Sequence, residues 1–106
     1  MEYSSIVVLF TVPSPEVGEE ISTSLVEKKL AACVNIIPEI SSIYQWQGTI
    51  EKDRENLLLV KTRIGLLDKI IVEISDIHPY DLPEVIALPI IAGSQDYLNW
   101  IDESTA

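Results

Sequence analysis

The order of strand-like and helix-like segments leaves this chain very few possible folds. Runs rich in β-branched residues mark strands, and apolar residues at steps of three and four mark helices. The sequence predicts strands at 6–10, 32–46, 49–62 and 85–91, helices at 15–29 and 66–77, and a short helix after Ser94. This order, β-α-β-β-α-β with a C-terminal helix, predicts an α+β, ferredoxin-like sandwich.

Two prolines support this topology. Pro38 falls in the second predicted strand and Pro89 in the fourth, whereas the first and third strands contain none. Proline has no N–H to donate to a strand ladder, so it belongs on edge strands or at bulges. A ferredoxin-like sheet has its first and third strands in the centre, and the proline positions agree with this arrangement.

Both predicted edge strands are apolar, at 34–37 and 85–88. Unprotected apolar edges tend to associate, and head-to-tail pairing of one edge with another closes into a ring. The predicted hairpin, 32–62, is longer than the sheet requires and could form an arm to a neighbouring subunit. We therefore predict a cyclic oligomer.

The chain is strongly acidic, with 17 Asp and Glu against 7 Lys and Arg among 106 residues, a formal net charge of −10. This sign argues against partners such as nucleic acid or an anionic membrane. The length suits one domain, 1–106. The single cysteine, the absence of a basic segment at Met1–Ser5 and the shortness of the apolar run 6–10 favour a cytoplasmic protein without a membrane span.

His78 and Cys33 are the only histidine and cysteine. His78 precedes Asp81 and Glu84, so its ring either acts with them as a metal ligand or proton shuttle, or bonds a carbonyl near the end of a helix. Cys33 is either a buried, inert residue or a soft metal ligand at a subunit junction. The two residues alone cannot form a zinc site within one chain.

Aromatic and charged residues around the hairpin are further candidates. Five aromatics either line a cleft or pack in a core or interface. They are Tyr44, Trp46, Tyr80, Tyr97 and Trp100. Glu51, Asp53 and Glu55 alternate as on a solvated strand face, and only Glu55 adjoins an apolar run. Lys61 follows four apolar residues and is a candidate for a partly buried pair with a carboxylate.

Familiar catalytic spacings are missing from the sequence. It contains no glycine-rich phosphate loop, no Gly-x-Ser-x-Gly elbow and no helix with paired histidines. An enzyme that used Glu84 and His78 as acid and base would have no accompanying nucleophile. We therefore predict a non-enzymatic protein.

Four segments resemble the signatures of the CutA divalent-cation tolerance proteins. They are Lys29–Asn35, Ser42–Gly48, His78–Glu84 and Gly93–Trp100. The resemblance extends over essentially the whole chain. It implies a cytoplasmic homotrimer of ferredoxin-like subunits, similar in assembly to the PII signalling proteins, with a link to copper and other divalent metals and no established catalytic activity.

The resemblance also implies an inter-subunit cleft with metal ligands. By position, the cleft residues are Cys33, Trp46, Glu55, Lys61, His78, Tyr80 and Glu84. The candidate metal ligands are His78, Cys33 and Glu84, with Asp81 as an alternative carboxylate. Some copper-linked family members have a cysteine where this chain has Phe10 and a histidine where it has Ile77, so two ligands that favour copper are missing here.

Two functional hypotheses result. The first is a trimeric, non-enzymatic protein that binds copper or another divalent metal ion without requiring an obligatory cofactor. The alternative is a PII-like signalling or adaptor module that binds a small anionic metabolite or a protein partner in the inter-subunit cleft. In that case Lys61 would supply the positive charge, and Trp46 and Tyr80 would form the walls.

Overall fold

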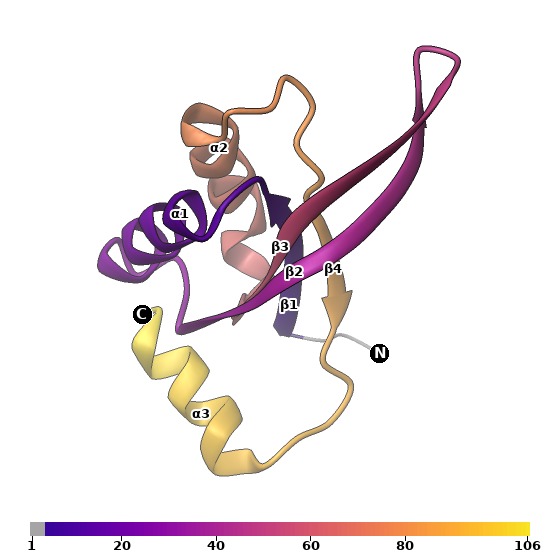
Figure 1. The fold of residues 1–106 in the computed structure, drawn as a ribbon. Helices are drawn as coiled ribbons and strands as arrows, with labels where there is room; N and C mark the ends of the chain where they lie inside the picture. Colours follow the sequence, from indigo (N-terminus) through magenta and orange to yellow (C-terminus); the bar gives the residue numbers. More distant parts are fainter. Residues whose placement is uncertain (1–3) are drawn as a thin grey trace.

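The computed structural model describes residues 4–106 (Figure 1), and Met1–Tyr3, part of the segment used for the signal-peptide expectation, lies outside that range. The elements are β1 (Ser5–Val12), α1 (Pro15–Glu27), β2 (Cys33–Trp46), β3 (Thr49–Arg63), a 3-10 turn (Ile64–Leu66), α2 (Leu67–Ile77), β4 (Ile86–Pro89) and α3 (Gln95–Ser104). The strand order is β2-β3-β1-β4, with every neighbouring pair antiparallel. The ferredoxin-like topology and the two predicted edge strands are confirmed.

Helices α1 and α2 lie against one face of the sheet (Figure 1). Alternate residues of β1 and β3 point toward them and form the core, which also includes apolar residues of both helices. The fully buried core side chains include Val8, Phe10, Leu25, Leu58, Val60, Ile70 and Ile74. The intervening residues point to the opposite face, which we call the uncovered face, and remain partly exposed.

The start and end of α1 follow from local hydrogen bonds. The Ser14 hydroxyl accepts from the Val17 N–H at 3.3 Å and so caps the N-terminus of the helix. The helix ends at Glu27 instead of the predicted residue 29, because Lys29 adopts a left-handed conformation with φ of 59°. The Leu30 N–H then donates to the Leu25 carbonyl at 2.9 Å and closes the helix terminus.

The hairpin turn lies between the two predicted strands, 32–46 and 49–62. Gln47 and Gly48 occupy it, with φ of 51° and 82°. A two-residue hairpin turn of this type needs two positive φ angles, and a β-branched residue such as Thr49 disfavours such a conformation. Thr49 instead begins β3, opposite Trp46.

Two other predicted elements were longer than the observed ones. The fourth strand is Ile86–Pro89 and not 85–91, because its pairing with β1 extends only over Ile6–Leu9. Leu66, predicted as the first residue of the second helix, belongs to the short 3-10 turn, and α2 begins at Leu67.

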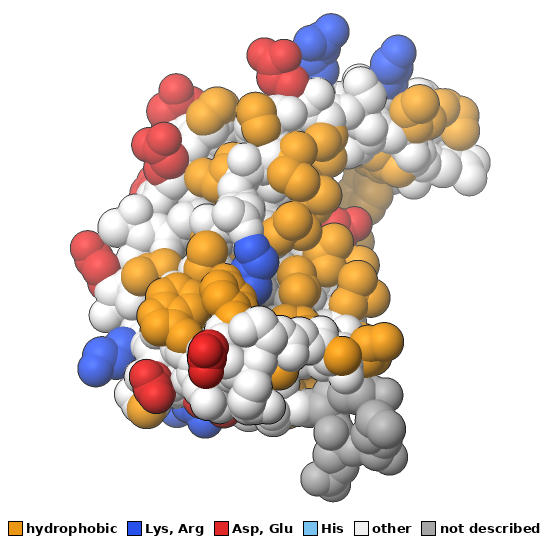
Figure 2. All heavy atoms as spheres, turned by 90° about the horizontal axis from the view of Figure 1, so that it is seen from below, with side chains coloured by type: hydrophobic (Ala, Val, Ile, Leu, Met, Phe, Trp, Pro, Cys, Tyr) orange, Lys and Arg blue, Asp and Glu red, His pale blue; other side chains and the backbone are white. Residues whose placement is uncertain are grey.

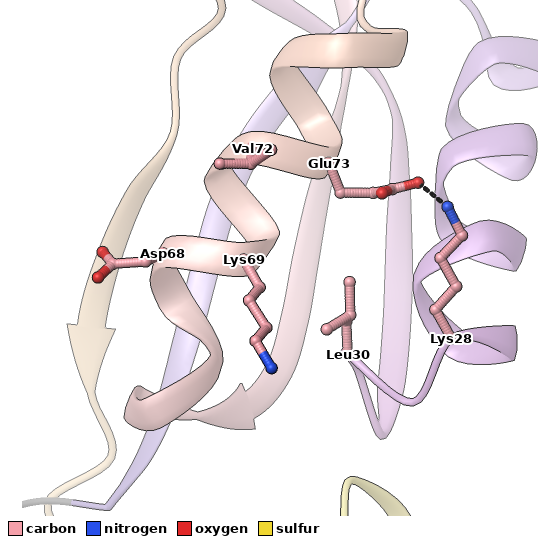
Figure 3. A pocket seen from close by; sticks show the side chains of 6 residues that line it. All are labelled: Lys28, Leu30, Asp68, Lys69, Val72 and Glu73. Atoms are coloured by element: carbon pink, nitrogen blue, oxygen red, sulfur yellow. Dashed lines mark hydrogen bonds and ion pairs between the residues drawn. The ribbon is translucent and has the colours of Figure 1, made fainter.

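A surface ion pair joins the two helices, as Figure 3 shows. Lys28 at the end of α1 contacts Glu73 of α2, and the Ser24 hydroxyl donates to the same carboxylate oxygen at 3.2 Å. The hydrogen bond from Lys28 is the main cause that holds the pKa of Glu73 below its ordinary value. Glu73 is therefore deprotonated more readily in the folded chain than in the unfolded chain.

This ion pair predicts a pH-dependent contribution to stability. Because the folded pKa of Glu73 is lowered, its contribution is present above the unfolded pKa and is lost as the pH falls through the folded pKa. Glu73→Gln is thus expected to be less stable than the wild type at neutral pH and equally stable in strong acid. Urea unfolding at both pH values measures the difference. Glu19→Gln, which removes an exposed charge elsewhere on α1, is the control, and a difference that persists in acid would contradict the prediction.

Candidate functional site

A cavity of about 680 Å³ lies at the root of the hairpin, between β2, β3 and the segment that follows α2. Its walls include three aromatic side chains and four carboxylates. These are Tyr44, Trp46 and Tyr80, and Asp53, Glu55, Asp81 and Glu84. No lysine or arginine of the described chain lines it. The cavity is therefore aromatic and strongly acidic, and several of its residues come from the predicted cleft.

A β-bulge in β2 shapes the cavity. Pairing with β3 is regular up to Ile37, which lies opposite Leu57, and resumes at Ile40, which lies opposite Glu55. Two residues of β2, Pro38–Glu39, therefore face a single residue of β3. The missing N–H of proline is tolerated at such an irregularity, which agrees with its predicted place on an edge strand.

The bulge decides which side chains enter the cavity. Beyond it, the even-numbered residues Tyr44 and Trp46 share a face with the odd-numbered Asp53 and Glu55 of β3. With regular pairing throughout, the two aromatic side chains would point to the opposite face, because side chains alternate along a strand. The bulge thus brings the aromatic residues of one strand to the carboxylates of the other.

Glu55 is the most buried acid of the cavity, with 7% of its surface exposed. Its Oε2 accepts a hydrogen bond from the Tyr80 hydroxyl at 2.8 Å. Burial, followed by this hydrogen bond, raises the pKa of Tyr80, so the phenol stays protonated and remains a donor. Glu55 and Tyr80, both predicted cleft residues, are brought together by the fold.

A second phenol–carboxylate pair lies further along the hairpin. The Tyr44 hydroxyl donates to Asp53, and this hydrogen bond is the main cause that raises the pKa of Tyr44 to about 12. Asp53 was expected on a solvated face, and that expectation is incomplete because its carboxylate also lines the cavity. The alternation of Asp53 with Glu55 was the available sequence signal that the two acids share a face.

His78 is held by hydrogen bonds at both ring nitrogens. Its Nε2 lies 2.6 Å from the Thr11 carbonyl oxygen, and its Nδ1 accepts from the Tyr80 N–H at 3.1 Å. These partners require a neutral ring that carries its proton on Nε2. The ring is 8% exposed and packs edge-on against Phe10, with centroids 6.5 Å apart. The interpretation of His78 as a residue that bonds a nearby carbonyl is confirmed, and neither nitrogen is free for a metal.

Cys33 and Lys61 lie away from the cavity. They are register partners at the far end of β2 and β3, where Tyr97 approaches the Cys33 thiol. Thr11 lines the cavity, and its partner on β3 is Leu57. Lys61 is four positions from Leu57 and thus about 13 Å further along the strand. Burial, followed by the nearby thiol, raises the pKa of Tyr97.

The expected ion pair of Lys61 does not form within the chain. Over residues 4–106 the single ion pair is that between Lys28 and Glu73. Lys61 is partly buried on the uncovered face without a carboxylate in range, because its strand neighbours Cys33 and Val7 are not acidic. The expectation is therefore wrong for a single subunit.

The candidate metal ligands do not converge in one chain. His78 has both nitrogens engaged, Cys33 lies at the other end of the sheet, and Glu84 lies at the cavity. Among the described residues, no three His, Cys, Asp or Glu side chains are placed to hold a metal ion together. This donor set does not fit a preformed copper site within the subunit.

The fold and the cavity define a small ferredoxin-like protein in which an extended hairpin forms one wall of an acidic, aromatic site. No helix within residues 4–106 is long and apolar enough to cross a membrane. The chain belongs to the CutA1 divalent ion tolerance protein family, whose model matches residues 6–104. This family is generally non-enzymatic, and the predicted family is confirmed.

Individual relatives match over nearly the whole chain. The divalent-cation tolerance protein CutA of Thermus thermophilus is 52% identical over 99 residues, which cover 93% of this chain and 96% of that protein. The chloroplastic protein CutA of Arabidopsis thaliana is 52% identical over 101 residues, or 95% of this chain, which spans 56% of its length.

Solved structures agree with the fold. The crystal structure of CutA1 from Oryza sativa matches with a TM-score of 0.95 at 49% identity, covering 98% of this chain and 95% of that one. CutA from Archaeoglobus fulgidus, described as periplasmic, matches with a TM-score of 0.94 at 41% identity over 96% of this chain and 99% of that one. The compartments named for relatives thus differ, since the Arabidopsis protein is described as chloroplastic.

Proposed function

We propose that this chain acts as a homotrimeric, cytoplasmic divalent-cation tolerance protein that binds divalent metal ions through the carboxylates of the cavity. The observation that carries the proposal is that four acids and no base line one cavity of a chain with a formal charge of −10. Such a field concentrates divalent cations. The family description and the name of the Thermus thermophilus relative support the same function.

The uncovered face of the sheet supports the trimer. Its residues Val7, Leu9 and Leu59 are partly exposed, and Ile86 and Leu88 on β4 are 52% and 53% exposed. Figure 2 shows hydrophobic side chains gathered along a hollowed flank, while most charged side chains lie at the rim of the view. A contiguous apolar surface of this kind marks a protein interface, and head-to-tail contacts close into a ring.

The donor atoms indicate which metals the cavity prefers. Asp81 and Glu84 are exposed carboxylates at the cavity and form no hydrogen bond or ion pair with other described side chains. Oxygen donors suit hard divalent ions better than copper, which favours imidazole and thiolate. Copper therefore binds weakly within a subunit, and only a subunit junction can add Cys33 or a released His78.

Calorimetric titration with copper tests this assignment. The double variant Asp81→Asn/Glu84→Gln is expected to weaken binding by at least about tenfold, because it removes two ligands. His78→Ala is expected to stay within about threefold of the wild type, because both ring nitrogens are already bonded within the chain. The reverse order of effects would make His78 the metal ligand and refute the carboxylate assignment.

The anionic-metabolite alternative receives less support from the geometry. Trp46 and Tyr80 do line one cavity, but Lys61 lies six residues along β3 from Glu55, about 20 Å away in the same subunit. The acids of the cavity would repel an anion. A protein partner on the surface around the cavity remains compatible with the fold.

A further inference from the structure

We propose that the cavity at the root of the hairpin binds a small organic cation, an alkylammonium compound of the diamine class, with Glu55 as its buried counter-charge. This inference goes beyond the binding of divalent metals, because the ligand is held by aromatic walls as well as by carboxylates. Three features carry it: an uncompensated buried acid, the aromatic residues around it, and the shape of the site.

The first feature is the missing counter-charge of Glu55. The side chain is 7% exposed, and its recorded partner is the neutral hydroxyl of Tyr80. Across residues 4–106, no lysine or arginine lies within ion-pair distance of it. Buried carboxylates are rarely found without a cationic partner, because desolvation of an isolated charge is costly. A ligand that brings a positive charge to Glu55 removes this penalty.

The second feature is the aromatic wall. Tyr44, Trp46 and Tyr80 line the same cavity as Glu55, and two of the three rings are held by hydrogen bonds from their hydroxyls to carboxylates. Aromatic faces attract ammonium groups through the ring quadrupole, and Trp does so most strongly. A hydrated divalent metal ion gains little from these walls, whereas an alkylammonium ion gains both cation–π attraction and contact for its methylene groups.

The third feature is the size and layout of the cavity. Its volume of about 680 Å³ falls within the range of small-molecule sites. Asp81 and Glu84 line it as exposed acids, while Glu55 is buried. Separated charges of this kind suit a ligand with two ammonium groups. The acids are not grouped as a preformed metal site requires, as the described residues contain no cluster of three ligating side chains.

The pocket between α1 and α2 offers no comparable site. It is lined by Lys28, Leu30, Asp68, Lys69, Val72 and Glu73 (Figure 3). Its two bases and two acids cancel in charge, and Lys28 is already paired with Glu73. The cavity of the hairpin differs in that its buried acid, Glu55, has a neutral hydrogen-bond partner and no cationic one among the described residues.

Calorimetric titration with 1,4-diaminobutane tests the proposal. The buffer contains EDTA to remove divalent metals and about 150 mM salt to screen non-specific attraction. We expect saturable binding to the wild type and none of the uncharged 1,4-butanediol. Glu55→Gln is expected to weaken binding by at least about tenfold, the effect of removing a charged hydrogen-bond acceptor. Trp46→Ala is expected to weaken it by between about twofold and thirtyfold, equivalent to one cation–π contact.

Glu19→Gln is the matched control, because it also removes one negative charge, at an exposed position of α1. Equal weakening by this control, or no saturable binding to the wild type, would overturn the proposal. Trp46 is 46% exposed, so its variant tests the site even if Glu55→Gln fails to fold. Binding of the diamine to Lys61→Met but not to the wild type would also overturn the proposal. It would show that Lys61 of a neighbouring copy occupies the cavity of the wild-type protein. Copper titrations without EDTA are independent, so failure of either proposal can be recognised separately.

Discussion

Leu88→Asp is expected to convert the proposed trimer into folded monomers. Leu88 lies on β4, is 53% exposed in the single subunit and points to the uncovered face beside Val7. In an isolated subunit the aspartate would be hydrated and well tolerated. In a trimer that covers this face, each copy would bury an unpaired charge, which costs several times the free energy of a surface substitution.

Sedimentation equilibrium measures this outcome directly. The molar mass is expected to fall from that of three chains of 11.8 kDa each to that of one. Val72→Asp is the matched control, because Val72 is 61% exposed on α2, on the helical side of the sheet. A Leu88→Asp protein that remained trimeric would show that the uncovered face is not the interface. Both variants are compared at one protein concentration, because association depends on it.

Phe10→Ala is expected to destabilise the chain by about 3–5 kcal/mol, the usual cost of emptying a buried aromatic site. Phe10 is fully buried in the core, and it contacts the edge of the His78 ring. Removal of the phenyl ring leaves a cavity beside His78, whose hydrogen bonds hold the segment that carries Tyr80. The effect is therefore expected to extend to the functional cavity.

Urea unfolding gives the loss of stability, and tyrosine fluorescence of a Trp46→Phe/Trp100→Phe background reports the surroundings of the four tyrosines, Tyr80 among them. Phe10→Leu is the control, with an expected cost of roughly 1.5 kcal/mol, since it keeps most of the apolar contact. Equal stability of Phe10→Ala and the wild type would contradict the placement of this residue in the core.

The fold could be predicted because several independent signals agreed. The apolar repeats defined six principal elements, and Pro38 and Pro89 assigned two strands to the edges. The boundaries were less accurate where tertiary pairing or a left-handed backbone decides them. Lys29 ends α1 early through its positive φ, and β4 stops where β1 no longer offers partners.

The candidate site was predicted only in part. Trp46, Glu55 and Tyr80 were candidates from their residue types and positions, and the family resemblance assigned them to one cleft. The fold places all three around one cavity. Periodicity alone would not have grouped them, because the bulge changes the side to which the even residues of β2 point. Lys61 could not be placed from local sequence, since its apolar neighbours indicate burial but not which charge lies nearby.

The two-residue bulge at Pro38–Glu39 also limits how this hairpin can change in evolution. Loss of one of these residues would restore regular pairing and rotate every side chain of the distal β2 segment to the other side of the ribbon. Paired insertions near the Gln47–Gly48 turn would only lengthen the ribbon and leave its inner end intact. Hairpins of varied length but constant bulge are therefore compatible with one binding cavity, whereas a single deletion at the bulge is not.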